Sequence, residues 1–455
     1  MISLLGVVVV ALAVRAGYVR IVSPNIGRYS DARAYHLLAD NLAHGRGYIR
    51  PYDLELLGVR RPTAEYPPMF PAVLAVGSRL GFGSLEGHRL FLCGFGAVTV
   101  GLIGLLGQRI GGPAVGLAAA AVAAVYPMLF QSDAALMPET LAALLGVALV
   151  LLAVWVRDRP DRWWRWTTLG LVLGLAVMTR AELAVFVPLL LGPLAWRLAQ
   201  RTDARRSLLA AGVAVLCLLA VVLPWTVRNW QRFDAFVPVS NNLGSVIRGA
   251  NCEPAYHGEY RGIWVVNLGN ETSGTVDPKR QCFRGFQLNG HTNEAQASAT
   301  DRTAGLHFAA AHAGQLPAVM AVRWLRTFGL YRPAQQTGFE ALEGRDLSWE
   351  RRGTWTFYGL AVLAAVGLLA WRWRPHAATH DPDVPRWVLL VPVIAVSLTV
   401  MATYGNQRFR AAAEPVLVVM AATAFMTGAE AVRRRRHRSH KTAPPSAAGA
   451  GGTVR

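Results

Sequence analysis

Long apolar runs recur along the chain and constrain its fold more than any other feature. Each is about 18 to 22 residues long, enough for an α-helix to cross a hydrocarbon core of about 30 Å. Only 16% of the residues are charged and 53% are hydrophobic, whereas a soluble domain has about 25% charged residues. We therefore predict an all-α polytopic membrane protein with about ten transmembrane helices, at 2–22, 89–107, 113–131, 140–156, 166–179, 183–199, 207–226, 354–372, 386–403 and 410–430.

The positive charge of the chain predicts its orientation in the membrane. Lys and Arg number 46 against 27 Asp and Glu, an excess that in a soluble chain would suggest a nucleic-acid partner. Here the excess lies in short loops between apolar runs, so we expect no nucleic-acid partner and apply the positive-inside rule. With a cytoplasmic N-terminus, every basic cluster falls on one side if the proline-interrupted run 66–82 is a juxtamembrane helix and not a span. The first run lacks a basic leader and a small-residue cleavage site, so we interpret it as a retained span.

This topology predicts four parts of the chain and places the short turn 131–139 on the external side. The tail is rich in Pro, Ala and Gly after a basic start, which favours disorder next to anionic headgroups. The parts are an N-terminal transmembrane catalytic module (1–227) with a first external loop (23–88), an external, periplasmic cap domain of mixed or helical structure (228–352), C-terminal transmembrane helices (353–432) and a disordered basic cytoplasmic tail (433–455).

Carboxylates lie at the external rim of the predicted membrane region. Asp31 follows the first span closely, at a depth where carboxylates are costly and usually functional, so it could deprotonate a hydroxyl. It could equally cap a surface helix. Glu65, Asp133 and Glu139 also lie at this rim, although Glu139 alone is explained as a first-turn acid after Pro138. Asp31 and Glu139 could hold a divalent ion such as Mg²⁺ or Mn²⁺, but no ligand spacing requires one, so no cofactor is certain.

Arginines gather on the same side as these acids. Each could simply reach the membrane interface, but together they favour a phosphate-bearing lipid, because guanidinium groups bind phosphate with two parallel hydrogen bonds. The candidate substrate-binding residues are Glu65, Tyr66, Asp133, Arg15, Arg180, Arg408 and Arg410.

The four cysteines are too few for a disulfide scaffold. Cys93 and Cys217 lie in apolar runs and are interpreted as packing residues. Cys252 and Cys282 share one polar segment that the topology places outside, where thiols oxidise, so we predict a disulfide between them.

Several short motifs occur in a recognisable order along nearly the whole chain. They are Tyr29-Ser30-Asp31, Gly45-Arg46-Gly47-Tyr48, Glu65-Tyr66-Pro67-Pro68, Met137-Pro138-Glu139, Met178-Thr179-Arg180, Pro224-Trp225-Thr226-Val227-Arg228-Asn229 and Tyr404-Gly405-Asn406-Gln407-Arg408-Phe409-Arg410. In this order they resemble the C superfamily of membrane glycosyltransferases (GT-C fold), in particular the branch of protein O-mannosyltransferases and lipid A aminoarabinose transferases.

The resemblance implies a polyprenyl-phosphate-linked sugar donor that reacts on the outer face of the plasma (inner) membrane. It implies Asp31 as the catalytic base and Glu139 as the acid of the second external loop, and it matches Glu65 to the acid before the double proline. Relatives in the aminoarabinose branch have lysine where this chain has Tyr66. The donor phosphate would then need another cation, for which Arg408, Arg410 and Arg15 are the candidates.

The leading hypothesis is an inverting hexosyl- or pentosyltransferase in which Asp31 accepts the proton of an acceptor hydroxyl and arginines stabilise the departing lipid phosphate. The acceptor could be a glycan, a lipid or a protein. A transporter or flippase of a lipid-linked glycan is the first alternative, although the internal repeats common in transporters are not visible here. A non-catalytic subunit of an envelope-glycan assembly complex is the second. The enzyme hypothesis predicts that Asp31, Glu139 and Arg408 converge on one pocket at the outer rim of the membrane.

Overall fold

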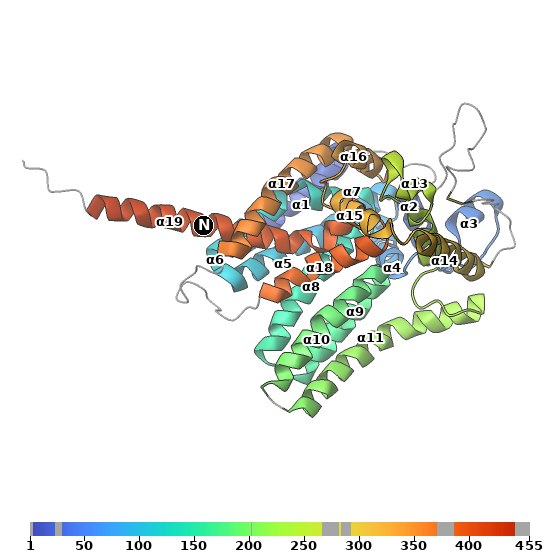
Figure 1. Cartoon of the computed structure of the whole chain (residues 1–455), viewed down its shortest axis with the longest axis horizontal. Coiled ribbons are helices and arrows are strands. Elements are labelled where there is room, and N and C mark those ends of the chain that lie inside the picture. Colours follow the sequence, from blue (N-terminus) through green and yellow to red (C-terminus); the bar gives the residue numbers. More distant parts are fainter. Residues whose placement is uncertain are drawn as a thin grey trace, which may run out of the picture.

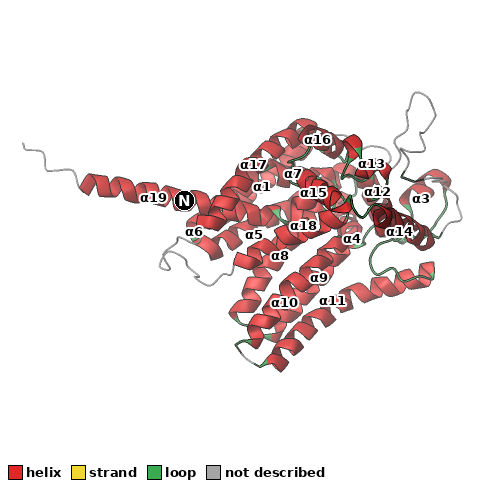
Figure 2. Ribbon diagram, in the orientation of Figure 1, coloured by secondary structure: helices red, strands yellow, loops and turns green. Residues whose placement is uncertain are grey.

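The computed structural model describes residues 3–22, 30–201, 203–265, 282–283, 293–370 and 386–441. These residues form helices joined by short loops and contain no β-strand (Figure 2). The elements are α1 (Leu4–Ile21), α2 (Asp31–Ala43), α3 (Pro51–Leu57), α4 (Met69–Gly77), η1 (Ser78–Phe82), α5 (Leu85–Gly111), α6 (Pro113–Val125), α7 (Pro127–Ala135), α8 (Glu139–Asp158), α9 (Trp163–Thr179), η2 (Ala181–Val185), α10 (Phe186–Ala199), α11 (Ala204–Phe233), α12 (Leu243–Ala250), α13 (Glu253–Tyr256), η3 (Gly258–Tyr260), α14 (Glu294–Ala311), α15 (Leu316–Thr327), α16 (Pro333–Leu342), α17 (Leu347–Ala370), α18 (Arg386–Ala402), η7 (Gln407–Ala412) and α19 (Glu414–Lys441).

The described residues of the ten predicted apolar runs are largely helical, which confirms the all-α polytopic prediction. By length and composition, seven described helices could cross a membrane, and the bent pair α6 and α7 would make eight. The predicted total of about ten is not reached by this criterion, because α9 and α18 have only 17 residues each. The pair α6 and α7 bends by 49° at Pro127, where the ring prevents a continuous helix.

The long helices form a bundle whose two ends differ. α9 packs between α8 and α11, α10 packs against α11, and α17 runs along α19 (Figure 1). The short helices α2 to α4 and α12 to α16 gather toward one end, whereas the N-terminus and the far end of α19 lie toward the other (Figure 1). This arrangement agrees with a topology in which both termini lie on one side of the membrane.

Close helix contacts depend on small residues. A Cβ added to Gly170 in α9 would lie 2.1 Å from the carbonyl oxygen of Ala214 in α11, and one added to Gly367 in α17 would lie 2.2 Å from that of Met420 in α19. Glycine is therefore required at both contacts, as is common where membrane helices approach closely. The core between these helices is built from buried Leu, Val, Ala and Ile side chains of α1, α5, α6, α8 to α10 and α17 to α19.

Several predicted boundaries differ from the helix ends. α11 continues to Phe233, beyond the predicted end of the N-terminal module at 227, and α17 begins at Leu347, before the predicted end of the cap at 352. The described part of the cap, 228–352, is helical. α19 is helical through Lys441, so residues 433–441 are not the disordered tail that we predicted, and 442–455 lie outside the described residues.

The described cap residues include a disulfide. Cys252 and Cys282 are bonded, with their Cα atoms 5.4 Å apart, and both side chains lie in a small apolar cluster with Tyr256 and Val319. Cys93 is buried and Cys217 is half-buried, both as free thiols.

Candidate active site

A cavity of about 990 Å³ lies where the first loop, the bundle and the cap meet. Its polar lining comes from segments far apart in the sequence: Asp31 at the start of α2, Glu139 at the start of α8, Arg180 between α9 and η2, and Arg408 in η7. The three residues predicted to converge, Asp31, Glu139 and Arg408, thus line one cavity. Its apolar lining includes residues of α11, and residues of α12 and α14 close it on the side of the cap.

Asp31 is the first residue of α2, but it is not the cap. The hydroxyl of Ser30 caps the helix by accepting a hydrogen bond from the backbone N–H of Arg33 at 3.4 Å. The Asp31 carboxylate instead accepts a hydrogen bond from the Tyr66 hydroxyl at 2.8 Å. Burial, together with the carboxylates of Asp31 and Glu65, raises the pKa of Tyr66 well above its usual value, so the hydroxyl keeps its proton and remains a donor. Tyr66 therefore holds the Asp31 carboxylate at the cavity.

Glu139 lies between two arginines. Its side chain is 1% exposed, contacts Arg180 and lies 3.9 Å from the Nε of Arg408. The Arg180 guanidinium also contacts Glu182 and lies 4.9 Å from the centre of the Phe409 ring. Glu139 is the first residue of α8, where the helix dipole favours a negative charge. Its place in the first turn is therefore compatible with a role in the site.

Both arginines remain charged despite burial. Burial lowers the pKa of Arg180, but the carboxylates of Glu182 and Glu139 outweigh it and the net shift is upward. Burial also lowers the pKa of Arg408, but its neighbours stabilise the charge and the net shift is again upward. These neighbours are Glu343, Tyr404, Glu139 and Asp31.

Two buried polar atoms of the site lack a hydrogen-bond partner, as do others elsewhere among the described residues. Among the described residues, neither the Oε2 of Glu139 nor the Nε of Arg408 has a hydrogen-bond partner. Buried polar atoms are rarely left unpaired, because the cost is about 1 to 3 kcal/mol each. One of these atoms accepts and the other donates, so a ligand that carries both a hydroxyl and an anionic oxygen would satisfy them.

The end of α11 explains one of the sequence motifs. Trp225, Thr226 and Asn229 donate hydrogen bonds to the backbone oxygens of Val239, Pro238 and Val237 at 2.7, 2.9 and 3.0 Å, respectively. The segment 237–239 lines the cavity, so these side chains fix one of its walls.

Arg228 of the same motif fixes a second wall. It donates to the backbone oxygens of Thr63 and Tyr48 at 2.7 and 2.8 Å, next to the segment that presents Tyr66. Arg228 of α11 thus holds the first loop in place.

The motif around Arg408 is explained by tight packing. The side chain of Asn406 accepts a hydrogen bond from the backbone N–H of Arg408 at 2.9 Å and begins η7. A Cβ on Gly405 would lie 2.4 Å from the carbonyl oxygen of Arg323 in α15, so only glycine fits there. The short helix and the glycine together aim Arg408 at the cavity.

Four predicted substrate-binding residues, Arg15, Asp133, Arg410 and Glu65, are not among the residues that line the cavity. Arg15 and Asp133 form an ion pair of 2.9 Å inside the bundle, with side chains 1% and 2% exposed. The predicted external turn begins inside α7, all of whose residues are buried, which is why Asp133 faces the bundle. Arg410 is fully buried, contacts Glu414 at 3.0 Å and lies 3.6 Å from the centre of the Phe357 ring.

Glu65 contributes through its backbone, and other site residues were missed. Its side chain is exposed, whereas its carbonyl oxygen accepts a hydrogen bond from Ser240. Glu343, which contacts Arg408 at 3.1 Å, was not predicted, because it lies in the cap outside every motif. Glu182 lies two residues after Arg180, and the pairing of opposite charges in that turn was the signal that could have found it.

The site does not fit a divalent cation. Among the described residues, no group of three or more His, Cys, Asp or Glu side chains could hold a metal ion. Glu139 is already between two arginines, and their positive charges would repel a cation there. We therefore derive no step through Mg²⁺ or Mn²⁺.

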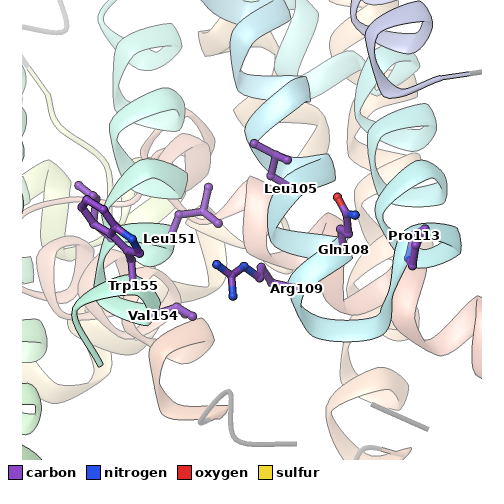
Figure 3. A pocket seen from close by; sticks show the side chains of 8 residues that line it. Leu105, Gln108, Arg109, Pro113, Leu151, Val154 and Trp155 are labelled. Carbon is purple, nitrogen blue, oxygen red and sulfur yellow. The ribbon is translucent and has the colours of Figure 1, made fainter. Parts of the chain in front are cut away.

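A second hollow, of about 810 Å³, lies between α5, α6 and α8 (Figure 3). Its lining is apolar except for Gln108 and Arg109, and Arg109 pairs with Asp158 at 3.5 Å. Trp155, which lines it, is about 24 Å along α8 from Glu139 at 1.5 Å per residue. This hollow therefore lies near the other end of the bundle and lacks the facing acids and cations of the first cavity.

Comparison with known proteins supports the resemblance found in the motifs. Residues 65–225 match the family described as dolichyl-phosphate-mannose-protein mannosyltransferase. The undecaprenyl phosphate-alpha-4-amino-4-deoxy-L-arabinose arabinosyl transferase of Pseudomonas aeruginosa (strain LESB58) is 31% identical over 207 residues, which cover 44% of this chain and 36% of that protein. The corresponding protein of strain PAO1 is 30% identical over the same length and with the same coverage. The chain thus spans about a third of the length of these relatives.

Solved structures show the same fold. The oligosaccharyltransferase of Archaeoglobus fulgidus in the apo form aligns with a TM-score of 0.52 and 14% identity, over 97% of this chain and 52% of that one. Its complex with Zn and sulfate aligns with a TM-score of 0.51 and 15% identity, over 95% of this chain and 50% of that one. The chain therefore shares the fold of this oligosaccharyltransferase.

Proposed function

We propose that this chain, which has the fold of the C-superfamily membrane glycosyltransferases, transfers a sugar from a polyprenyl-phosphate-linked donor to an acceptor hydroxyl. One observation carries the proposal: a carboxylate that a tyrosine orients, a second carboxylate and two charged arginines line one cavity, although they come from four separate segments. The unpaired atoms of Glu139 and Arg408 fit a ligand that combines a phosphate with sugar hydroxyls.

The chemistry follows from the roles that these groups can take. The Asp31 carboxylate accepts the proton of the acceptor hydroxyl while the oxygen of that hydroxyl bonds to the anomeric carbon of the sugar. The bond from that carbon to the phosphate oxygen breaks, and the polyprenyl phosphate leaves with the electron pair. Because attack and departure occur on opposite faces of the carbon, the configuration inverts. Arg408 and Arg180 stabilise the negative charge that develops on the phosphate.

The membrane setting suits a lipid-linked donor. The matched arabinosyl transferase is named for an undecaprenyl phosphate sugar, and we propose a donor of that chemical class here. The polyprenyl chain would lie among the apolar helices while the phosphate stays at headgroup depth, near the ends of α8 and α9. We further propose that the cavity faces the exterior of the plasma membrane and takes a glycan, lipid or protein acceptor.

The test replaces Asp31 and compares a matched variant on the same helix. Asp31→Asn removes the proton acceptor with little change in volume, whereas Asp40→Asn makes the same change at a half-exposed residue whose carboxylate pairs with Arg46. Cells that lack the protein are complemented with each variant, and their lipid-linked sugars and envelope glycans are measured by mass spectrometry. We expect Asp31→Asn to lower transfer by about 10² to 10⁴-fold, the usual contribution of a general base, and Asp40→Asn to restore it fully.

Two controls make the result decisive. Purified Asp31→Asn protein should unfold at the same temperature as the wild type and bind undecaprenyl phosphate equally well. Unchanged product with Asp31→Asn would overturn the enzymatic proposal and favour a transporter or an assembly subunit.

A further inference from the structure

Arg408 is occupied in this structure by a carboxylate that belongs to the protein itself. The Nη1 atom of Arg408 lies 3.1 Å from Oε2 of Glu343, and its Nη2 lies 3.3 Å from the Tyr404 hydroxyl. The Arg408 side chain lines the cavity. The cation best placed for the donor phosphate therefore already has an anionic partner.

The charges around the cavity make this pairing a problem for phosphate binding. Three arginines, Arg180, Arg302 and Arg408, line the cavity, against the carboxylates of Asp31, Glu139 and Glu182 in its lining and that of Glu343 beside Arg408. A phosphodiester would add a further negative charge to a cavity in which Arg180 and Arg408 are already paired with carboxylates. Glu139 and Glu182 both contact Arg180, so Glu343 is the carboxylate whose departure frees Arg408 with the least disruption.

The local structure allows Glu343 to leave. It caps the C-terminal end of α16, and its side chain is 33% exposed, against 1% for Glu139. Its neighbour Arg345 is held separately inside the protein by Glu350 at 3.3 Å and Ser132 at 3.4 Å. The Glu343 side chain can therefore rotate away while the loop stays anchored.

We propose that Glu343 is an internal counter-ion that the donor's phosphate displaces from Arg408. The proposal rests on the proposed function, because it takes the donor phosphate to bind at Arg408. It assigns to Glu343 the role of a positioning residue that keeps Arg408 extended toward the cavity until the donor arrives.

The proposal predicts that donor binding takes up a proton. Burial raises the pKa of Glu343 to about 7; Arg408 opposes this shift, and the carboxylates of Asp31, Glu340 and Glu139 add to it. Protonation of Glu343 neutralises the carboxylate that competes for Arg408, so phosphate binding at Arg408 favours the protonated form. Affinity should then rise as the pH falls, since a neutral Glu343 no longer competes. For one proton and a pKa of about 7, the dissociation constant should fall about tenfold from pH 8 to pH 6.

The test measures binding of a synthetic polyprenyl phosphate methyl ester to the purified full-length protein at pH 6, 7 and 8. This diester keeps a single negative charge over that range, so its own titration does not contribute. We expect Glu343→Gln to bind at pH 8 as tightly as the wild type binds at pH 6, with no further dependence on pH. Glu86→Gln removes a carboxylate that is 61% exposed and whose ion-pair partner is Arg20, and should behave as the wild type does.

A variant that lacks Arg408 distinguishes competition for this arginine from simple repulsion between Glu343 and the phosphate. In Arg408→Gln protein, the additional change Glu343→Gln should no longer alter affinity, because there is no cation to release. Equal dissociation constants and pH profiles for the wild type and Glu343→Gln would overturn the counter-ion role alone. Absence of diester binding to the wild type at any pH would instead overturn the proposed donor class.

Discussion

The buried pair of Arg15 and Asp133 provides a quantitative test of the assignment of both residues to the bundle. Arg15 forms an ion pair with Asp133 at 2.9 Å and donates hydrogen bonds to the backbone oxygens of Ala11, Ala123 and Ala124 at 3.2 to 3.3 Å. Asp133 in turn accepts from the Thr140 hydroxyl at 2.8 Å. The pair thus ties α1 to α6, α7 and α8.

Replacing one partner of the pair should lower the free energy of unfolding far more than replacing both. Arg15→Gln leaves a carboxylate that is 2% exposed without its cation, a loss of about 3 to 5 kcal/mol for buried pairs. Asp133→Asn should cost a similar amount, because it leaves the guanidinium unpaired. In the double variant no buried charge remains, and we expect it to recover more than half of either single loss.

The assay is unfolding of the purified protein in detergent, with lipid-phosphate binding measured in parallel. The three variants and the wild type form a double-mutant cycle, and binding should be unchanged in all that fold. Single losses below about 1 kcal/mol together with weakened lipid-phosphate binding would refute this reasoning and return Arg15 and Asp133 to the substrate site.

Three further predictions concern topology, the base and the cap. Reporter fusions after Arg206 and after Arg261 should report cytoplasmic and external locations; the same location for both would contradict the topology. Tyr66→Phe removes a hydrogen bond to the Asp31 carboxylate worth about 1.5 to 3 kcal/mol. If Asp31 is the base, as we propose, turnover should fall about 10 to 100-fold with unchanged thermal unfolding, and a normal rate would show that the hydroxyl does not orient it. Replacing both Cys252 and Cys282 with serine opens a link between residues 30 apart, which the chain-entropy model values at about 3 to 4 kcal/mol; an unchanged unfolding midpoint would contradict a stabilising role.

The sequence predicted the helices well, because length and hydrophobicity alone determine which segments can cross a bilayer. The described residues of the ten runs are largely helical, although the run 113–131 forms two helices, α6 and α7, and the predicted limits 140–156 lie inside Glu139–Asp158. The number of helices long enough to span a membrane was less well predicted, because α9 and α18 have only 17 residues each.

The candidate site was predictable only where a motif fixed a residue at a helix end. Asp31, Glu139, Arg180 and Arg408 all lie at such positions, and all line the cavity. Inside an apolar run, the sequence does not reveal which direction a charged side chain faces, so Arg15 was assigned to the substrate although it faces the bundle.

Glu343 was missed for a different reason. Its partner Arg408 is 65 residues away in the sequence, and their contact depends on how the cap folds back onto the bundle. No local pattern reports such a contact.

The end of α11 affects how natural variants of this protein should be interpreted. Trp225 and Asn229 hold one wall of the cavity, and Arg228 holds the first loop beside Tyr66. A single inherited substitution there would displace either the wall at 237–239 or the loop beside Tyr66, so a screen for loss of activity would rank it with changes at Asp31. Selection would then preserve this helix end as strictly as the reacting groups, and an evolutionary profile would mark both alike. Only measurements that separate folding from turnover would distinguish the residues that shape the cavity from those that react in it.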